Sequence, residues 1–255
     1  ATTKINNSTI YDVASLSKIL STLPNVMQQY DKNLINMETT LGTMLPIFNN
    51  SDKKDIHFKE LLSHYAGLIA WIPFYKATLD HSSKPLDKYY RKIGDEQFSK
   101  KVADSLFMRN DYHDTIMKMI VESKLSTKKE YKYSDFTFMI LKDYLEKTTG
   151  KSLDVLSSEN FYKSLGANNT TYNPLQKFNK NDIPPTEIDT YFRHQIIQGY
   201  VHDMAAAMEG GVAGHAGIFS NAMDVAKIMQ MYLQKGNYGN YQYFSEKTFN
   251  DFSGE

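Results

Sequence analysis

Apolar residues recur mostly at helical spacing along this chain, and the first such run lies close to its start. Residues 9–13 predict a short extended segment that leads into a helix near Ser15. The predicted apolar side of that helix comprises Leu16, Ile19, Leu20, Leu23, Val26 and Met27. Because Pro24 has no backbone N–H, we expect the helix to kink or end there.

Two further apolar patterns occupy the first half of the chain. Residues 58–64 predict a short helix that ends before Gly67. Residues 98–123 carry apolar positions at helical spacing, with an interruption near Asn110 and Asp111. We therefore expect two amphipathic helices over this stretch.

Turn and cap signals divide the region that follows. A buried helix is expected after Ser134 and Asp135, and it should end at Gly150, which suits the left-handed position after a helix. Ser152 can cap the next helix. Residues 168–185 are rich in Asn, Thr, Pro and Lys, which predicts a surface loop.

The last third combines loose alternation with a glycine-rich turn. Residues 190–201 favour a short hairpin, and residues 210–217 predict a turn before a helix that Ser220 or Asn221 would cap. No internal repeat is visible. We therefore expect one mostly helical domain with a minor sheet.

Composition narrows the class of protein. The 255 residues include 29 Lys plus Arg and 29 Asp plus Glu, so the formal net charge is zero. A nucleic-acid-binding surface normally appears as a basic excess, so no nucleic-acid partner is expected. Cysteine is absent, which excludes disulfides, thiolate metal sites and a cysteine nucleophile. The apolar residues 67–74 are too few to span a membrane.

Histidine and glycine patterns give no sign of a metal or a cofactor. His194 and His202 are too far apart to form a pair on one helix face, and no carboxylate spacing completes a zinc site. The glycine-rich residues 210–217 lack the Gly-Lys-Ser/Thr of a phosphate loop. His64 is interpreted as a hydrogen-bonded structural residue, and the pair His202–Asp203 as part of a turn.

Ser15 and Lys18 are the first candidates for chemistry. Three residues apart on a helix, their Cβ atoms lie roughly 5–6 Å from each other on one face. A serine hydroxyl becomes an effective nucleophile when a nearby base removes its proton, and a lysine amine can be that base. The same spacing also arises from a capping serine and a surface lysine, so alone it leaves both interpretations open.

Tyr133, Ser134 and Asp135 form the second candidate element, again at the entry to a predicted helix. The tyrosine and the aspartate would bring a phenol and a polar side chain into the same cleft as Ser15. Taken alone, these residues are equally compatible with a packing tyrosine and a helix-capping aspartate.

Taken together, these segments resemble the serine β-lactamase and penicillin-binding-protein family, in its class C and esterase-like branch. Residues 10–18 (IYDVASLSK) resemble the family's nucleophile segment, and residues 57–68 (HFKELLSHYAGL) its LLxHxxG segment. Residues 133–135 (YSD) fall at its Tyr-x-Asn motif. Residues 199–203 (GYVHD) and 210–220 (GGVAGHAGIFS) are similar to a later block, typical of members joined to a family 3 glycoside hydrolase.

The resemblance implies a fold and a set of roles. The fold would be α+β, a helical lobe packed on an antiparallel sheet. Ser15 would be the acylated nucleophile and its backbone N–H an oxyanion donor, Lys18 the proton acceptor, and Tyr133 a second general acid or base. Asp135 would contact substrate where the family has asparagine; it keeps the acceptor but loses the amide donor.

The family's third motif, a Lys/His-Thr/Ser-Gly triplet on a strand, is the part that matches least well. His215 and Gly217 resemble it superficially and are candidate substrate-binding residues, but they lie in a glycine turn before a helix. We therefore expect the true motif after Glu255, and the first sheet strands before Ala1. On this interpretation residues 1–255 are one partial serine hydrolase domain.

The resemblance also implies the function. It would be a serine hydrolase that forms an acyl-enzyme on Ser15 and acts on peptidoglycan-type D-amino-acid peptides, β-lactams or small esters. The location would be extracytoplasmic, and a covalently linked glycoside hydrolase is a candidate partner. Two alternatives stay open: a non-catalytic module that binds wall peptides, and an auxiliary domain of a β-N-acetylglucosaminidase-type glycosidase that carries the main activity.

Overall fold

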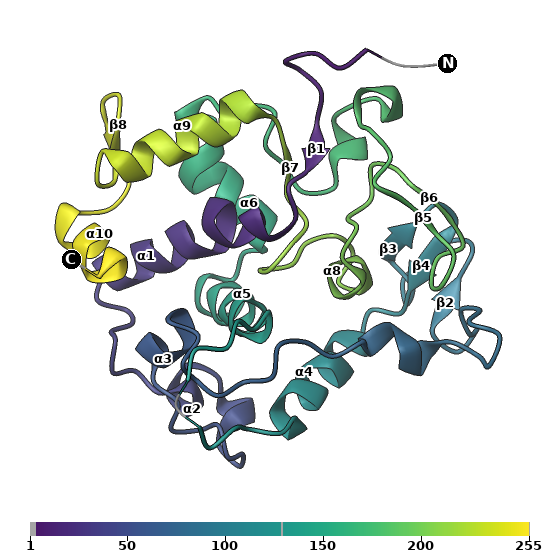
Figure 1. Cartoon of the computed structure of the whole chain (residues 1–255), viewed down its shortest axis with the longest axis horizontal. Coiled ribbons are helices and arrows are strands. Elements are labelled where there is room, and N and C mark those ends of the chain that lie inside the picture. Colours follow the sequence, from purple (N-terminus) through teal and green to yellow (C-terminus); the bar gives the residue numbers. More distant parts are fainter. Residues whose placement is uncertain (1–3, 129, 255) are drawn as a thin grey trace.

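Helices are the main regular secondary structure in this computed structural model, which describes residues 4–128 and 130–254 (Figure 1). The α-helices are α1 (Leu23–Asp31), α2 (Leu41–Met44), α3 (Phe58–Leu62), α4 (Tyr112–Glu122), α5 (Phe136–Thr149), α6 (Leu153–Ser157), α7 (Lys163–Leu165), α8 (Met204–Met208), α9 (Ala222–Leu233) and α10 (Glu246–Ser253). Tighter 3-10 turns occupy Ala14–Leu16, Pro46–Phe48, Phe74–Thr78, Pro174–Gln176 and Lys180–Asp182, and wider π-helical turns occupy Lys18–Thr22 and Ser158–Tyr162.

The strands are short, and in the described residues they pair only in antiparallel fashion. They are β1 (Tyr11–Asp12), β2 (Tyr90–Arg91), β3 (Lys100–Ala103), β4 (Leu106–Met108), β5 (Glu187–Asp189), β6 (Gln195–Ile197), β7 (Phe219–Ser220), β8 (Asn237–Tyr238) and β9 (Tyr241–Gln242). Their sheet orders are β1-β7, β2-β4-β3, β5-β6 and β8-β9. Helices with small antiparallel sheets confirm the predicted α+β class.

The core is built around α5, which lies at the centre of Figure 1 between α1 and α4. Its residues 136–145 are all buried, including the charged Lys142 and Asp143. Helix α5 ends as predicted at Gly150, whose φ of 69° is left-handed. This buried helix carries Asp135 at its N-terminal cap and so positions one wall of the candidate site.

The helix after Ser15 continues through Pro24, so the expectation that it ends there is wrong. A π-helical turn, Lys18–Thr22, passes directly into α1. Proline leaves backbone carbonyls of the preceding turn without their usual donor. Here the carbonyl of Ile19 accepts the hydroxyl of Tyr232 at 2.8 Å, and that of Leu20 accepts the hydroxyl of Tyr162 at 3.0 Å. Side chains from elsewhere in the core therefore replace the missing donors.

The prediction of two helices over residues 98–123 is wrong for the first half. β3 and β4 form a hairpin there, and only α4 is helical. The hairpin turns at Ser105, whose φ is 49°. Val102 and Met108 are buried while Lys101 is exposed. In so short a segment the apolar positions also fit a helical period, so the pattern alone does not distinguish a strand from a helix.

Smaller expectations were met in part. Leu16, expected on the inner side of its helix, is 43% exposed. The predicted hairpin exists as β5 and β6 but begins earlier, at Glu187. Of the two proposed caps for α9, Asn221 is the one used, and it accepts the N–H of Asp224 at 3.0 Å. Ser152 occupies the cap position of α6 but makes no capping hydrogen bond with its side chain.

The glycine-rich turn before β7 packs directly against α5. A Cβ at Gly214 would lie 1.9 Å from the carbonyl oxygen of Phe138, so only glycine permits this approach. The close contact brings the backbone of the next residue, His215, alongside Lys18. In the part of the chain that the structure describes, no helix is long and apolar enough to cross a bilayer.

Candidate active site

Ser15 is presented to solvent by a turn that follows β1. Tyr11 of β1 pairs with Ser220 of β7, so the chain enters the turn from a fixed strand. Ala14, directly before Ser15, has φ 47°, an unfavourable value for a residue with a Cβ. The resulting 3-10 turn leaves Ser15 exposed at its surface.

Two side chains hold this strained turn in place. The Asp12 carboxylate accepts the N–H of Ala14 at 2.8 Å and the N–H of His202 at 2.7 Å. The Ser17 hydroxyl donates to the carbonyl of Ala14 at 2.7 Å and accepts the N–H of Ile218 at 3.0 Å. The orientation of Ser15 is therefore tied to two segments about 200 residues further along the chain.

Lys18 lies beneath Ser15 and is almost fully buried. Its Nζ donates to Ser15 Oγ at 3.0 Å, to Asp135 Oδ1 at 2.7 Å and to the carbonyl oxygen of His215 at 3.0 Å. An ammonium group has three N–H donors, and all three have partners here. The amine is thus held at a fixed position within reach of the serine hydroxyl.

Tyr133 approaches Ser15 from the other side. Its hydroxyl donates to Ser15 Oγ at 3.1 Å, and Lys18 Nζ lies 5.0 Å from the centre of its ring. The His64 ring lies 4.8 Å from that of Tyr133, and His64 Nδ1 accepts the N–H of Ser134 at 3.2 Å. Burial and the charge of Lys18 lower the pKa of His64, which suits a neutral supporting ring.

Asp135 contacts Lys18 through one carboxylate oxygen. Only Oδ1 takes part in that contact, and among the described residues Oδ2 has no hydrogen-bond partner. The side chain is 26% exposed, so Oδ2 remains open to a ligand. Its backbone N–H donates to the carbonyl of Ala70 at 3.0 Å, which fixes the start of α5.

His215 and Asp203 form a pair that sequence reasoning did not find. His215 Nε2 lies 2.9 Å from Asp203 Oδ1, and the same oxygen accepts the N–H of Ala206 at 2.8 Å. Burial alone would raise the pKa of Asp203, but the interactions with His215 and the Ala206 N–H hold it well below its usual range. The interpretation of His202–Asp203 as a turn therefore missed the contact of Asp203 with the site.

Gly217, the other residue proposed from the third-motif resemblance, lies inside the turn. Its φ is 117°, and a Cβ there would lie 2.3 Å from the carbonyl oxygen of Gly211 and 3.0 Å from the Tyr172 ring. Gly217 therefore permits the close packing that leads from His215 to β7.

A cavity of about 280 Å³ adjoins the Lys18 partners. Its polar wall contains Asp135, Asp203 and His215. Its apolar wall contains Trp71, Ile72, Phe74, Phe136, Met139 and Met204. Within this wall Trp71 is 55% exposed, whereas Phe74 is buried.

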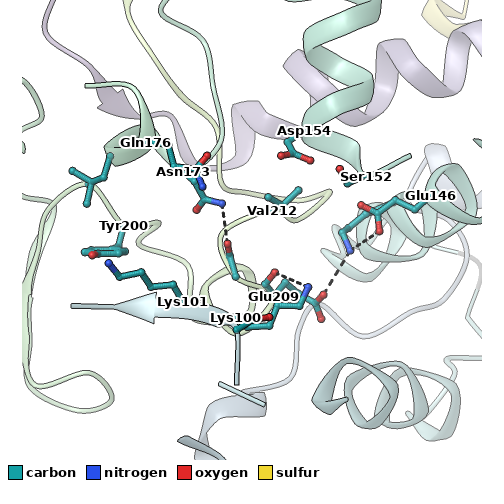
Figure 2. A pocket seen from close by; sticks show the side chains of 15 residues that line it. Lys100, Lys101, Glu146, Ser152, Asp154, Asn173, Gln176, Tyr200, Glu209 and Val212 are labelled. Carbon is teal, nitrogen blue, oxygen red and sulfur yellow. Dashed lines mark hydrogen bonds and ion pairs between the residues drawn. The ribbon is translucent and has the colours of Figure 1, made fainter. Parts of the chain in front are cut away.

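A second cavity, of about 480 Å³, is separate from these residues (Figure 2). Lys101 and Tyr200 lie on one side of it, and Glu146, Ser152 and Asp154 on the other. Glu209 also lines this cavity and forms ion pairs with His113 and Lys142. Within the described chain, no group of three or more His, Asp or Glu residues is arranged to hold a metal ion.

The fold places the chain in a recognisable class. It superposes on FmtA from Staphylococcus aureus with a TM-score of 0.65 and 19% identity, covering 97% of this chain and 57% of that one. The class C β-lactamase from Rhodobacter sphaeroides gives a TM-score of 0.60 at 14% identity, with 97% and 57% coverage. At such identities the likeness shows a shared fold.

The sequence identifies the family. The Beta-lactamase family model matches residues 1–248, and the chain belongs to this family. It is 30% identical over 268 residues to the N-acetylmuramyl-L-alanine amidase of Bacillus subtilis (strain 168), covering 98% of this chain and 56% of the relative. A provisionally named D-alanyl-D-alanine carboxypeptidase of Escherichia coli (strain K12) is 29% identical over 270 residues, with the same coverage.

These comparisons confirm the predicted family and fold class. The chain spans a little over half the length of both curated relatives. The roles expected for Ser15, Lys18, Tyr133, Asp135, His215 and Gly217 are not tested by them.

Proposed function

We propose that the protein is a serine hydrolase that forms an acyl-enzyme on Ser15. The observation that carries the proposal is the convergence on Ser15 Oγ of Lys18 Nζ at 3.0 Å and Tyr133 OH at 3.1 Å. A nucleophile flanked by two groups that can exchange protons is the arrangement that acyl transfer requires.

In the proposed reaction, Ser15 Oγ attacks the carbonyl carbon of an ester, amide or β-lactam. Lys18, as the neutral amine, accepts the hydroxyl proton, while the Ser15 N–H stabilises the developing oxyanion. Tyr133 passes a proton to the leaving group and takes one from the water that hydrolyses the acyl-enzyme. The carboxylic acid then leaves and Ser15 is restored.

The proposed substrates are peptidoglycan-type D-amino-acid peptides, β-lactams or small esters, and the proposed location is outside the cytoplasm. The names of the curated relatives, an amidase and a carboxypeptidase of wall-type substrates, support this class. A family 3 glycoside hydrolase partner remains a proposal from the sequence resemblance alone.

One observation favours a second candidate, a non-catalytic module that binds wall peptides. Asp135 stands 2.7 Å from Lys18 and forms an ion pair with its amine. A lysine held as an ammonium has no lone pair for the serine proton. The hydrolase and the binding module thus differ in whether Lys18 gives up its proton when substrate is bound.

Covalent labelling separates the two. Each of two probes, a fluorescent penicillin and a fluorophosphonate, is incubated with the full-length wild-type protein, with Ser15→Ala and with the exposed-serine control Ser82→Ala. The hydrolase predicts labelling that Ser15→Ala abolishes and Ser82→Ala retains. If neither probe labels wild-type protein that unfolds cooperatively on heating, the binding module is favoured.

A further inference from the structure

The cavity beside Lys18 has an unusual charge distribution for an enzyme expected to bind carboxylate-bearing peptides. Asp135 and Asp203 both line it, and each has one carboxylate oxygen with no partner among the described residues. Their side chains are 26% and 35% exposed, so both free oxygens can be reached by a ligand.

The nearby basic group, Lys18, already has three hydrogen-bond partners. Lys18 uses its three N–H donors on Ser15, Asp135 and the His215 carbonyl, as described above. A substrate carboxylate placed in this cavity would face two carboxylates and would find no uncommitted cation among the lining residues that the structure describes. Like charges at close range disfavour such binding.

A third polar group points to the same cavity independently of the two acids. His215 is 2% exposed, lines the cavity, and its Nδ1 has no hydrogen-bond partner among the described residues. Nε2 is paired with Asp203, so Nδ1 is the ring nitrogen left for a ligand. A buried polar atom without a partner carries a free-energy cost that a polar group of a ligand would relieve.

The remaining wall is apolar and aromatic. Phe136, Met139 and Met204 line the interior, and Trp71 stands half-exposed at the edge. Such a wall accepts an alkyl or aryl group, and an aromatic face also attracts a cation. The site therefore combines two carboxylates and an unpartnered ring nitrogen with a small hydrophobic surface.

We infer that this cavity is an ammonium subsite, and that the preferred substrates are esters or amides whose acyl group carries a free amine, such as α-aminoacyl esters. The ammonium would lie between Asp135 Oδ2 and Asp203 Oδ2, and the side chain of the aminoacyl group against the apolar wall. This inference rests on the proposed function, because it specifies the acyl group that Ser15 receives.

The reaction is an ordinary hydrolysis. Ser15 Oγ forms a bond to the acyl carbon, the ester C–O bond breaks and the alcohol leaves with a proton. Water then cleaves the aminoacyl-serine ester, so one ester and one water give one amino acid and one alcohol. No oxidant, metal or cofactor enters the balance.

A matched substrate series tests the inference in the protein as encoded. The p-nitrophenyl esters of alanine, isobutyric acid and succinic acid present a cationic, a neutral and an anionic acyl group of small size. For alanine and isobutyrate each kcat/KM is divided by the hydroxide-catalysed rate constant of the same ester, which removes differences in intrinsic reactivity. The succinate monoester is also hydrolysed by its own carboxylate, so its turnover is taken as the Ser15-dependent rate above that background. We expect the corrected value for alanine to exceed that for isobutyrate at least tenfold, and succinate to be the poorest substrate.

The variant Asp203→Asn sharpens the test. Asparagine keeps the helix cap and the acceptor for His215 but removes the charge. The ratio of alanine to isobutyrate should fall about three- to tenfold, the loss expected for one partly exposed ion pair. The control Asp87→Asn, which neutralises an exposed carboxylate outside the described cavities, should leave the ratio at its wild-type value.

The outcomes distinguish the inference from the proposed function. Ser15-dependent turnover that is equal for all three esters, or greatest for succinate, would overturn the ammonium subsite and leave the hydrolase intact. An unchanged ratio in Asp203→Asn would also overturn it. Absence of Ser15-dependent turnover with every ester would overturn the proposed function itself.

Discussion

Two groups of charged side chains lie along α5, one at its N-terminal cap, Asp135, and one at Lys142 and Asp143, and they differ in how completely they are paired. The Ser15 site joins Lys18 to Asp135 and leaves Ser15, Tyr133 and one oxygen of Asp135 accessible. The His113 cluster consists of His113, Lys142, Asp143, Glu146 and Glu209.

In the His113 cluster nearly every bonding position is used. His113 Nδ1 lies 2.9 Å from Glu209 and its Nε2 lies 3.1 Å from Asp143, while Lys142 lies 3.1 Å from Glu146. Burial alone would lower the pKa of His113, but these two carboxylates raise it to about 10. His113 and Lys142 in turn hold the pKa of Glu209 at about 2, although burial alone would raise it.

The contrast separates a structural role from a functional one. The saturated His113 cluster joins α4 and α5 to the end of α8 and has little capacity left for a ligand. The Ser15 site keeps unused acceptors beside a strained turn, which is where binding and chemistry are expected. Helix α8 connects the two, because its N-terminal cap is Asp203 and its C-terminal cap is Glu209.

The largest expected effect is on catalysis at the Ser15 site. Lys18→Ala removes the proposed proton acceptor and should lower the rate of acylation roughly a hundredfold to ten-thousandfold, the range for loss of a general base. Stopped-flow or gel-based labelling with fluorescent penicillin measures this rate. The exposed-lysine control Lys32→Ala should label like wild type. Normal labelling of Lys18→Ala would contradict the proposed role of the amine.

The second effect is on stability, and it concerns the His113 cluster. His113→Ala removes the closest cationic partner of Glu209 and Asp143, both almost fully buried. Breaking a buried pair in this way should lower the free energy of unfolding by about 3 kcal/mol. Urea denaturation measures it, with the exposed-histidine variant His81→Ala as control. Equal stability of the two variants would show that the cluster contributes little.

A smaller effect is expected from Asp135→Asn, which installs the residue typical of the family. The amide keeps an acceptor for Lys18 but removes the negative charge beside it. The rate of acylation by a penicillin, which carries a carboxylate, should rise about tenfold. A rate that falls instead would mean that the Asp135 carboxylate assists acylation.

The smallest effect is the pH dependence of the His113 contribution. The imidazolium contributes fully below the usual pKa of 6.5, and its contribution is lost as pH rises toward about 10. Glu209 contributes fully above the usual pKa of 4.5, and its contribution is lost as pH falls toward about 2. The stability difference between wild type and His113→Ala should therefore be greatest between pH 4.5 and 6.5. A difference that is constant from pH 3 to pH 9 would exclude this account.

Local sequence signals predicted one part of the molecule well and another part poorly. Short motifs predicted that Ser15, Lys18 and Tyr133 belong to one site. The motif that ends at Asp135 and the cap at Gly150 predicted the helix between them. Local signals did not predict the hairpin of β3 and β4, because β4 also pairs with β2, which lies outside the segment.

The missed contacts at the site have the same cause. Asp203 meets His215 across a turn, and Asp12 meets the backbone of His202 from 190 residues away. No periodicity or spacing marks such pairs, since they depend on how the glycine turn and α8 pack against α5. The grouping of Ser15, Lys18 and Tyr133 was thus accessible from sequence, whereas the charge of the neighbouring cavity required the structure.

The central claim is that Ser15 carries the acyl group, and one measurement tests it most directly. The protein as encoded is quenched during turnover of an alanine ester, digested and analysed by tandem mass spectrometry. We predict an alanyl adduct on Ser15 that is absent from Ser15→Ala. An adduct on another residue, or turnover that persists in Ser15→Ala, would contradict the account.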